Sequence, residues 1–471
     1  MEVLYEQLQD DTRSFWQSPS AGVRRLEVMP SPGDFFRDYV ATSTPLIISG
    51  GASACLKAER QCWEDLSALV RRSSGDLEVT VDFTPDGRGD CVVDVPTGTL
   101  RDRSPPSNGG GTHRSSSNGG SGREGAYEAD DEVKERGSTS EMSAADGSVT
   151  ETPGPATTAV FVKPEERRMK FENFVGMLSA APVAAAGDGG SAPGVSSGCS
   201  SGGDGVPYLS HQNDSLRQEF PGLAADVEPS LALARETFGN EPDAVNLWIG
   251  DDRSVSAVHK DHYENMYCVL RGEKHFTLLP PSDVLFLYEQ DFPQGRYRQT
   301  RDADDVPGEE GRGRRAGSRK GKFEVDMEDG TVPWIPVDPD FPDLEKYPLF
   351  RYASPVKCRV GPGDILYLPA LWYHRVSQKG ITVAVNYWHD MQFDHKYVNY
   401  RFLQSLAATA AKCASPQKDA SLLWEAGGRA SGEGVEAEAT EDKKGIVASR
   451  VDNAVAEAGA GWSGERGGAS R

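Results

Sequence analysis

Three residues of the sequence have the types and spacing of ligands for iron. His259 and Asp261 occupy positions i and i+2 in VHKDHYEN, so on an extended strand both side chains point to the same face. His374 follows in LPALWYHRV, after the turn GPGD and at the start of a later strand. Two histidines and one carboxylate form a facial triad that holds iron and leaves positions open for a bidentate co-substrate and dioxygen. We therefore expect these three residues to bind a metal ion.

An H-x-D pair alone is weak evidence, because the chain has eight histidines, and we expect His262, His275, His389 and His395 to be structural or surface residues. The prediction gains weight from Lys274, in GEKHFTLLP on the strand after the H-x-D strand. If the Lys274 side chain points into the interior of a β-barrel formed by these strands, its ammonium needs a buried partner, which the distal carboxylate of 2-oxoglutarate supplies. The alternative is a solvated lysine in a hairpin.

Composition narrows the class of protein. The 471 residues carry a formal net charge of −22, which opposes non-specific binding to a phosphate backbone, so no nucleic acid is expected as a partner. Seven cysteines without a CxxC pair favour a reducing compartment. There is no signal-like start, and apolar runs such as ITVAVNYW are far shorter than the roughly 20 residues of a membrane span. We expect a cytoplasmic protein, with a nuclear location as the alternative if RGRRAGSRKGK is an address and not a solvated loop.

Pattern and composition divide the chain into periodic blocks separated by stretches rich in Gly, Ser and charge. The early blocks predict helices at residues 3–16, PGDFFRDYV and CWEDLSALVRR, and strands at TPLIIS and LEVTVDF. Short β-rich runs follow Asn246, and about eight antiparallel strands imply a jelly roll. The expected division is an N-terminal α+β cap at 1–96, a disordered insertion at 97–158, a helical segment at 159–183, a disordered insertion at 184–205, a β domain at 206–412 with a flexible insertion at 302–322, and a disordered tail at 413–471.

The quoted motifs resemble one known family. NLWIG, HKDHYENMYCVLRGEKHF, GDILYLPALWYH and VAVNYWHDMQFDHKY are similar to the JmjC-only protein hydroxylases, including the jumonji domain-containing protein 7 type of lysyl hydroxylase. The similarity covers nearly all ordered blocks, including LEVTVDFTPDG and PWIPVDPDFPDLEKYP, and fails across the low-complexity insertions. It implies a mainly β fold, a cupin-like double-stranded β-helix with an N-terminal helical region.

The resemblance implies that the metal ligands and Lys274 keep the roles expected above, and it adds four residues around the co-substrate, Tyr208, Ser256, Asn265 and Asn386. Tyr208 and Ser256 resemble hydroxyl donors that assist Lys274, although relatives often carry threonine at the position of Ser256. Asn265 and Asn386 match amides near the metal-bound end of 2-oxoglutarate. A core hydrogen-bonding role for each asparagine is the alternative.

The resemblance further implies a dioxygenase that uses Fe(II), 2-oxoglutarate and O2 to hydroxylate a protein. The favoured reaction is (3S)-lysyl hydroxylation of a translation-associated, developmentally regulated GTP-binding protein, and a homodimer through the N-terminal helices is expected. Histone methyl-lysine demethylation is one alternative, although no reader module accompanies the core. An endopeptidase acting on methylated histone tails is another, but no HExxH motif supports it. A binding module with a vestigial metal site ranks last.

Overall fold

The computed structural model describes residues 2–16, 22–57, 63, 65–74, 76–97, 157–180, 205–300 and 322–414. The segments expected to be disordered, at 97–158, 184–205, 302–322 and 413–471, fall almost entirely outside these ranges, so their disorder stays a prediction. Within the described ranges, no helix is long and apolar enough to cross a bilayer.

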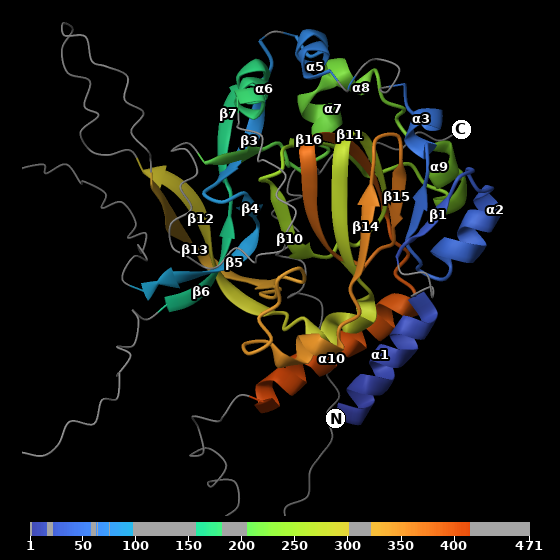
Figure 1. The fold of residues 1–471 in the computed structure, drawn as a ribbon, viewed down its shortest axis with the longest axis vertical. Helices are drawn as coiled ribbons and strands as arrows, with labels where there is room; N and C mark the ends of the chain where they lie inside the picture. Colours follow the sequence, from blue (N-terminus) through green and yellow to red (C-terminus); the bar gives the residue numbers. More distant parts are fainter. Residues whose placement is uncertain are drawn as a thin grey trace, which may run out of the picture.

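Two long strands form the centre of the fold (Figure 1). β11, Tyr263–Leu279, and β16, Tyr373–Asp390, pair antiparallel over their whole lengths, with register shifts midway along β11. Two glycines with positive φ lie where the strands bend, Gly272 at +68° and Gly380 at +70°. A Cβ on Gly272 would lie 2.6 Å from the Thr382 side chain, so this bend requires glycine.

The bends divide each long strand between two sheets. The first half of β11 and the second half of β16 are flanked by β15, Ile365–Leu368, and β9, Ala244–Gly250. The other halves are flanked by β14, Val356–Val360, and β10, Val255–His259. These facing sheets form the predicted double-stranded β-helix, so the fold class is confirmed. Four of the eight short strands expected from the sequence merge in pairs into β11 and β16.

The N-terminal segment contributes strands to both barrel sheets. β2, Leu46–Ile48, pairs with β15 and carries β1, Arg24–Leu26, as the next strand outward. β4, Arg88–Gly89, pairs with β10 at the other end of the sheet order. The segment at 1–96 that was expected to form a cap therefore contains helices and strands, but three of its strands, β1, β2 and β4, extend the barrel.

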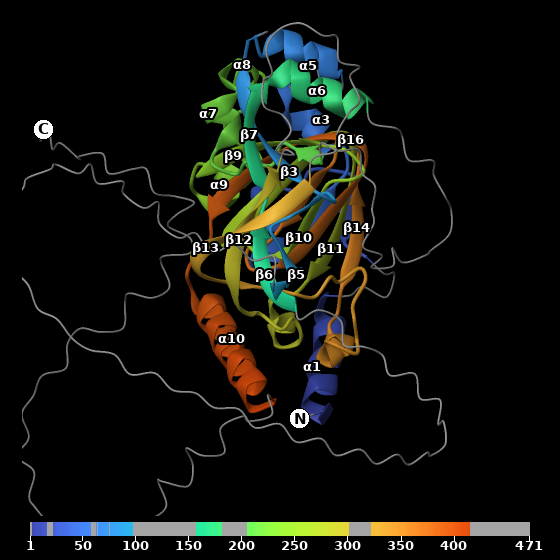
Figure 2. The ribbon, with the colours of Figure 1, turned by 90° about the vertical axis from the view of Figure 1, so that its left-hand side faces the viewer.

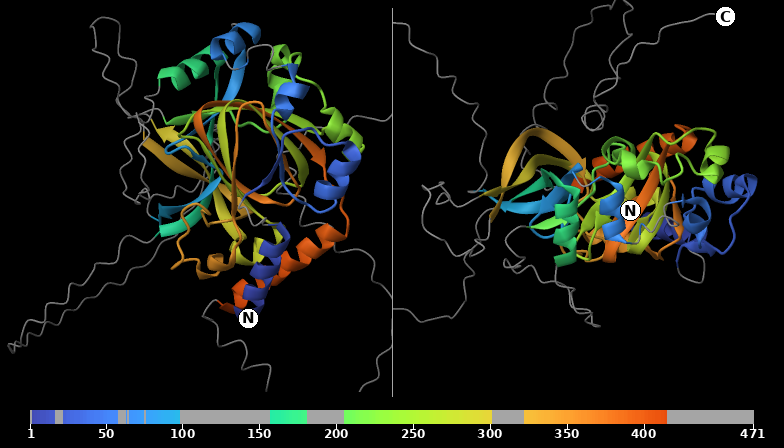
Figure 3. Two further views of the ribbon diagram at one scale, coloured as in Figure 1. Left: turned by 45° about the vertical axis from the view of Figure 1, so that its right-hand side comes forward. Right: turned by 90° about the horizontal axis from the view of Figure 1, so that it is seen from above.

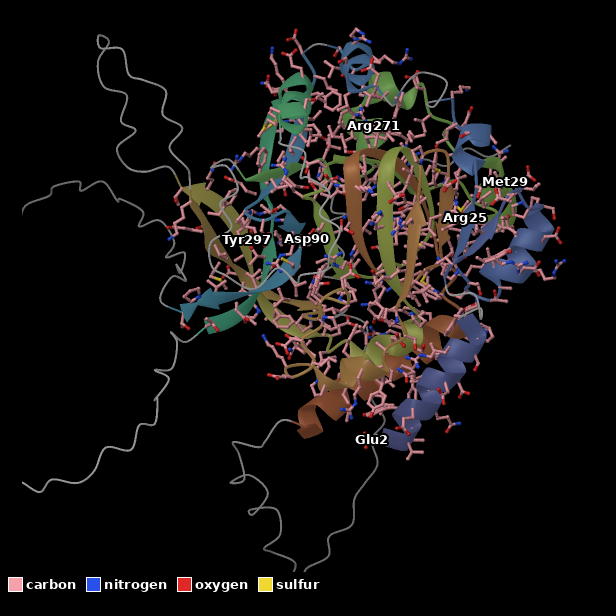
Figure 4. All side chains as sticks on the ribbon, viewed as in Figure 1. Glu2, Arg25, Met29, Asp90, Arg271 and Tyr297 are labelled. Atoms are coloured by element: carbon pink, nitrogen blue, oxygen red, sulfur yellow. The ribbon has the colours of Figure 1, made fainter. Side chains whose placement is uncertain are left out.

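Two smaller sheets lie against the barrel. One consists of β7, Glu165–Lys170, β3, Glu78–Thr84, and β8, Val206–Tyr208. The other, here called the outer sheet, projects to one side of the barrel in Figure 3 and contains β13, Lys322–Trp334, β12, Gln290–Thr300, β6, Thr157–Lys163, and β5, Cys91–Pro96. Figure 4 labels Asp90 and Tyr297 on this side of the molecule.

The prediction of a helical segment at 159–183 is wrong for its first half. Residues 157–170 form β6 and β7, and only Phe171–Ala180 forms a helix, α6. The β-branched run TTAVFVK favours a strand, and EERRMK alternates between half-buried and exposed residues, which is the period of a strand. The helix therefore begins twelve residues later than expected, at Phe171 instead of residue 159.

Short helices cover the first barrel sheet and enclose the largest hydrophobic cluster, which includes Phe35, Trp63, Leu247 and Tyr387. They are α2, Pro32–Phe35, continued by a π-helical turn at Phe36–Val40, α3, Gly51–Cys55, α5, Leu66–Arg72, α7, Ser215–Glu219, α8, Pro221–Ala224, and α9, Ala232–Phe238.

A second cluster closes the opposite end of the barrel. It contains the 3-10 turns η3, Pro281–Phe286, and η4, Pro348–Tyr352, against which α10, His395–Ala414, and α1, Glu2–Trp16, pack. Figure 2 shows α1 and α10 on opposite sides of this end. The barrel interior holds a third cluster, which includes Trp248, Phe276 and Trp372 beside the cavity described next.

Candidate metal centre and active site

The three expected metal ligands meet where β10 and β16 pair. His259 lies directly opposite His374 in the antiparallel register, and the imidazole centroids are 4.2 Å apart. Asp261 follows two residues after His259, and its Oδ2 lies 3.6 Å from Nε2 of His374. One ligand atom of each residue lies within 4.8 Å of the others. The strand pairing thus assembles two imidazoles and a carboxylate from segments more than a hundred residues apart.

Backbone contacts orient both imidazoles in the same way. Nδ1 of His259 lies 2.7 Å from the carbonyl oxygen of Ala257, and Nδ1 of His374 lies 3.0 Å from that of Trp372. A carbonyl only accepts, so each Nδ1–H donates and each Nε2 keeps its lone pair for a metal. Burial, and then the neighbouring His259, lower the pKa of His374 to about 4, which keeps the ring neutral as metal binding requires. The donor set therefore fits an iron(II) ion.

A cavity opens beside the ligands. Seven of the eight residues predicted from the sequence line it, namely Tyr208, Ser256, His259, Asp261, Asn265, His374 and Asn386. The eighth, Lys274, does not line the cavity but contacts one of the lining residues: its ammonium donates a hydrogen bond to the Tyr208 hydroxyl over 3.1 Å. The structure therefore brings all eight residues close together.

Lys274 is 1% exposed. Besides Tyr208, its ammonium contacts Oε1 of Gln378, which faces it across the β11–β16 pair. Within the described ranges no carboxylate forms an ion pair with Lys274. Burial alone lowers the pKa of Lys274 to about 7, so an anion placed beside the side chain would stabilise its charged form. The solvated-hairpin alternative for Lys274 is wrong.

The other predicted residues form hydrogen-bonded pairs. The Ser256 side chain hydrogen-bonds to Tyr208, so it reaches Lys274 through the phenol. Asn386 accepts a hydrogen bond from Nε1 of Trp248 at 2.9 Å and donates one to Oδ1 of Asn265 at 3.3 Å. Both asparagines are nearly fully buried, so the core hydrogen-bonding role is present together with the cavity-lining position.

Sequence reasoning missed several residues of the site. Gln378 fixes Lys274 and is itself held by the carbonyl of Asp251 and the hydroxyl of Thr382. Its position opposite Lys274 depends on strand register, which no local pattern encodes. Trp334 lies over His259, with ring planes 7° apart and centroids 6.3 Å apart. It comes from the end of β13, a strand that the sequence analysis did not predict.

Comparison with known proteins agrees with this geometry. Residues 32–395 match the family described as the cupin-like domain, which is most of the chain. A JmjC domain-containing protein E from Dictyostelium discoideum is 31% identical over 398 residues, which cover 81% of this chain and 88% of that protein. The chain belongs to the cupin-like JmjC family. The resemblance read from the sequence is therefore confirmed.

Two further relatives of the JmjC chain are more similar over a shorter region. The "Lysine-specific demethylase JMJ32" of Arabidopsis thaliana is 46% identical over 213 residues, and the human "Bifunctional peptidase and (3S)-lysyl hydroxylase JMJD7" is 42% identical over 204 residues. Each alignment covers 43% of this chain, and it spans 57% and 59% of the two relatives' lengths respectively. The cupin-like JmjC family uses Fe(II), 2-oxoglutarate and O2, which confirms the expected cofactors at the level of the family.

Proposed function

We propose that this JmjC protein is an Fe(II)- and 2-oxoglutarate-dependent oxygenase that hydroxylates a lysine of a protein substrate. One observation carries the proposal: His259, Asp261 and His374 line a cavity together with Tyr208, and the Tyr208 hydroxyl accepts a hydrogen bond from Lys274, a buried lysine that has no carboxylate partner among the described residues. A metal site alone fits many activities. A buried cation beside it fits a co-substrate with a carboxylate at its far end.

Each residue has a distinct task under this proposal. His259, Asp261 and His374 hold the iron, which together with 2-oxoglutarate and dioxygen supplies the oxidant for a C–H bond. Lys274, held in place by Tyr208 and Gln378, takes the distal carboxylate of 2-oxoglutarate. Aromatic side chains and Val376 line the rest of the cavity and restrict water near the metal.

The amides have a positioning role in this proposal. Asn265 and Asn386 lie on neighbouring strands at the cavity wall, where they place polar groups close to the metal-bound end of the co-substrate. Because Asn386 is bonded to both Trp248 and Asn265, its amide is fixed before any ligand binds. A fixed amide costs less ordering entropy on binding than a free one.

The substrate assignment rests on chemistry and on the relatives. The Arabidopsis and human relatives act on lysine according to their names, the first as a demethylase and the second as a lysyl hydroxylase. The net charge of −22 suits a cationic target. We infer lysine as the target class, with a developmentally regulated GTP-binding protein as the proposed partner and the cytoplasm as the proposed location.

Demethylation is the second candidate, because the same oxidant hydroxylates the methyl group of a methylated lysine. The name of the Arabidopsis relative favours it. Peptidase activity is favoured only by the name of the human relative. In the described residues, the only group of three or more candidate metal ligands is the His-Asp-His cluster, so a paired-metal hydrolytic site has no counterpart there.

A homodimer is also part of the proposal. α1 exposes Val3 and Leu4 at 74% and 59%, and α10 exposes Val398 and Phe402 at 65% and 68%. The two helices that carry these side chains close one end of the barrel (Figure 2). Apolar side chains gathered at one end of a molecule favour association with a second copy. Sedimentation of the full chain, compared with a Val398→Glu, Phe402→Glu variant, tests this.

The experiment that tests the activity uses iron, 2-oxoglutarate and lysine-containing peptides, in unmodified and methylated forms. Mass spectrometry separates three outcomes: an added oxygen on lysine, loss of a methyl group, or chain cleavage. Asp261→Ala should abolish the first two outcomes, whereas His395→Ala, a matched change at a histidine with an 81% exposed side chain, should not. If cleavage persists in Asp261→Ala, the oxygenase site does not produce the cleaved peptide.

A further inference from the structure

An acidic and aromatic edge borders the metal cavity where β9, β11 and β16 meet. It consists of Asp243, just before β9, Tyr263 at the start of β11, and Trp388 and Asp390 at the end of β16. Tyr263 faces Asp390 in the strand register and donates a hydrogen bond to Oδ2 of Asp243 over 3.4 Å. We call these four residues the acidic edge. Tyr263 follows the metal ligand Asp261 by two residues, which places the edge next to the metal.

The indole of Trp388 connects the edge to the cavity. It stacks on Tyr263 with centroids 4.8 Å apart and planes 4° apart, and it lines the same cavity as the metal ligands. Trp388 is only 7% exposed, yet its Nε1–H has no hydrogen-bond partner within the described structure. A buried N–H without a partner costs roughly 1 to 3 kcal/mol, which an oxygen of a bound ligand can offset. The cavity wall is thus prepared to donate to an occupant.

The carboxylates of the edge also lack a counter-charge. Asp243 and Asp390 are exposed, and neither forms an ion pair with a basic residue in the part of the chain that the structure describes. Arg217 approaches the backbone carbonyl of Asp243, but its guanidinium pairs with Asp214. Burial, and then the charge of Asp243, raise the pKa of Asp390, as expected where two carboxylates lie close together without a cation.

We propose that the acidic edge is the recognition site for a lysine side chain of the protein substrate. The ammonium lies between Asp243 and Asp390 and beside the Tyr263 ring, and the Trp388 N–H donates to an oxygen of the same substrate. Carboxylates and aromatic faces both attract an ammonium, and one edge supplies both. The inference rests on the proposed function, since it names the part of the substrate that the metal site acts beside.

A binding experiment with the full chain separates this inference from the activity. The protein is loaded with zinc(II), which is redox-inert, and with 2-oxoglutarate. Two probes are compared by ligand-observed NMR: Nα-acetyl-L-lysine N-methylamide, and Nα-acetyl-L-norleucine N-methylamide, which lacks the ammonium. We expect the wild-type protein to prefer the lysine probe by roughly three- to tenfold, the range for two exposed charge contacts.

Variants assign the preference to the edge. Asp243→Asn combined with Asp390→Asn should abolish the preference, whereas Glu78→Gln, an equally conservative change at an exposed carboxylate in β3, should leave it intact. Trp388→Phe keeps a stacked ring without the N–H, so it should weaken both probes by about the same factor, roughly two- to tenfold. Thermal unfolding of each variant verifies that it is folded.

The outcomes that overturn the inference are distinct from failure of the proposed function. Equal binding of the two probes by the wild-type protein overturns it, as does a preference that survives the double variant or no binding of the lysine probe up to its solubility limit. Failure of the iron-loaded protein to oxidise lysine peptides, with the preference intact, would instead count against the proposed reaction alone.

Discussion

Replacing Lys274 by methionine should weaken 2-oxoglutarate binding far more than it weakens the fold. Lys274 is 1% exposed and has no carboxylate partner among the described residues, so it would be the only full countercharge for the distal carboxylate. Removing one member of a buried ion pair costs about 3 to 5 kcal/mol, which corresponds to roughly 10²- to 10⁴-fold in the apparent dissociation constant. Tyr208→Phe removes one neutral hydrogen bond and should cost only about 0.5 to 1.5 kcal/mol.

The lysine also predicts the pH dependence of stability without ligand. Burial lowers the pKa of Lys274 from 10.5 to about 7 in the folded protein. Between these values the unfolded chain binds more protons than the folded one, so the contribution of Lys274 to the free energy of unfolding rises with pH from about 7 to about 10. Lys274→Met should remove that rise. Above pH 7, 2-oxoglutarate binding should take up a proton, and its affinity should fall by up to about tenfold per pH unit.

Calorimetric titration with 2-oxoglutarate at pH 6 and pH 9, together with urea unfolding across the same range, measures both effects. Lys379→Met is the matched control, because Lys379 is an exposed lysine at the bend of the same β16 strand. Unchanged 2-oxoglutarate affinity in Lys274→Met, or equal losses in the Lys274 and Lys379 variants, would refute the assignment of Lys274 to the distal carboxylate.

Three further predictions concern the metal, the barrel bends and the insertions. Asp261→Ala should abolish turnover and weaken metal binding by at least about tenfold in calorimetry, with the fold retained; full turnover in this variant would remove the iron assignment. Gly272→Ala should lower the free energy of unfolding by more than about 1 kcal/mol in urea unfolding. Gly380→Ala should lower it less, because a Cβ added at Gly380 would meet no atom within 4 Å. A larger loss in Gly380→Ala would contradict the bend geometry. Deleting residues 100–155 and 415–471 should leave iron-dependent succinate formation and the melting temperature nearly unchanged; loss of folded protein would place those residues in the fold.

The sequence predicted the parts of the site that depend on local spacing. The H-x-D spacing identified His259 and Asp261, although β10 ends at His259 and Asp261 lies in the short connection before β11, not on the strand as expected. Lys274 follows on β11 by simple chain order. The distal ligand His374 was found because a recognisable turn precedes it. Tyr208, Ser256, Asn265 and Asn386 needed the family resemblance, since an isolated hydroxyl or amide carries no spacing signal.

What the sequence did not predict depends on tertiary register. Gln378 faces Lys274 only because β11 and β16 pair with their register shifts at the bends. β13, which carries Trp334, consists of charged and apolar residues beside a low-complexity stretch, so its strand period was overlooked. β6 fell mostly within the segment that was expected to be helical, since a short apolar run fits both structures until its pairing partner β5 is known.

The outer sheet has a consequence for how this protein tolerates changes of length. Pro96 ends β5 directly opposite Thr157 at the start of β6, and Thr300 ends β12 directly opposite Lys322 at the start of β13. The two ends of each long intervening segment are therefore held side by side, so the length of the segment does not alter the spacing of the framework. These two points are natural places for a lineage to gain or lose sequence, and for an experimenter to insert a fluorescent reporter. The metal strands, with their fixed register, offer no such freedom.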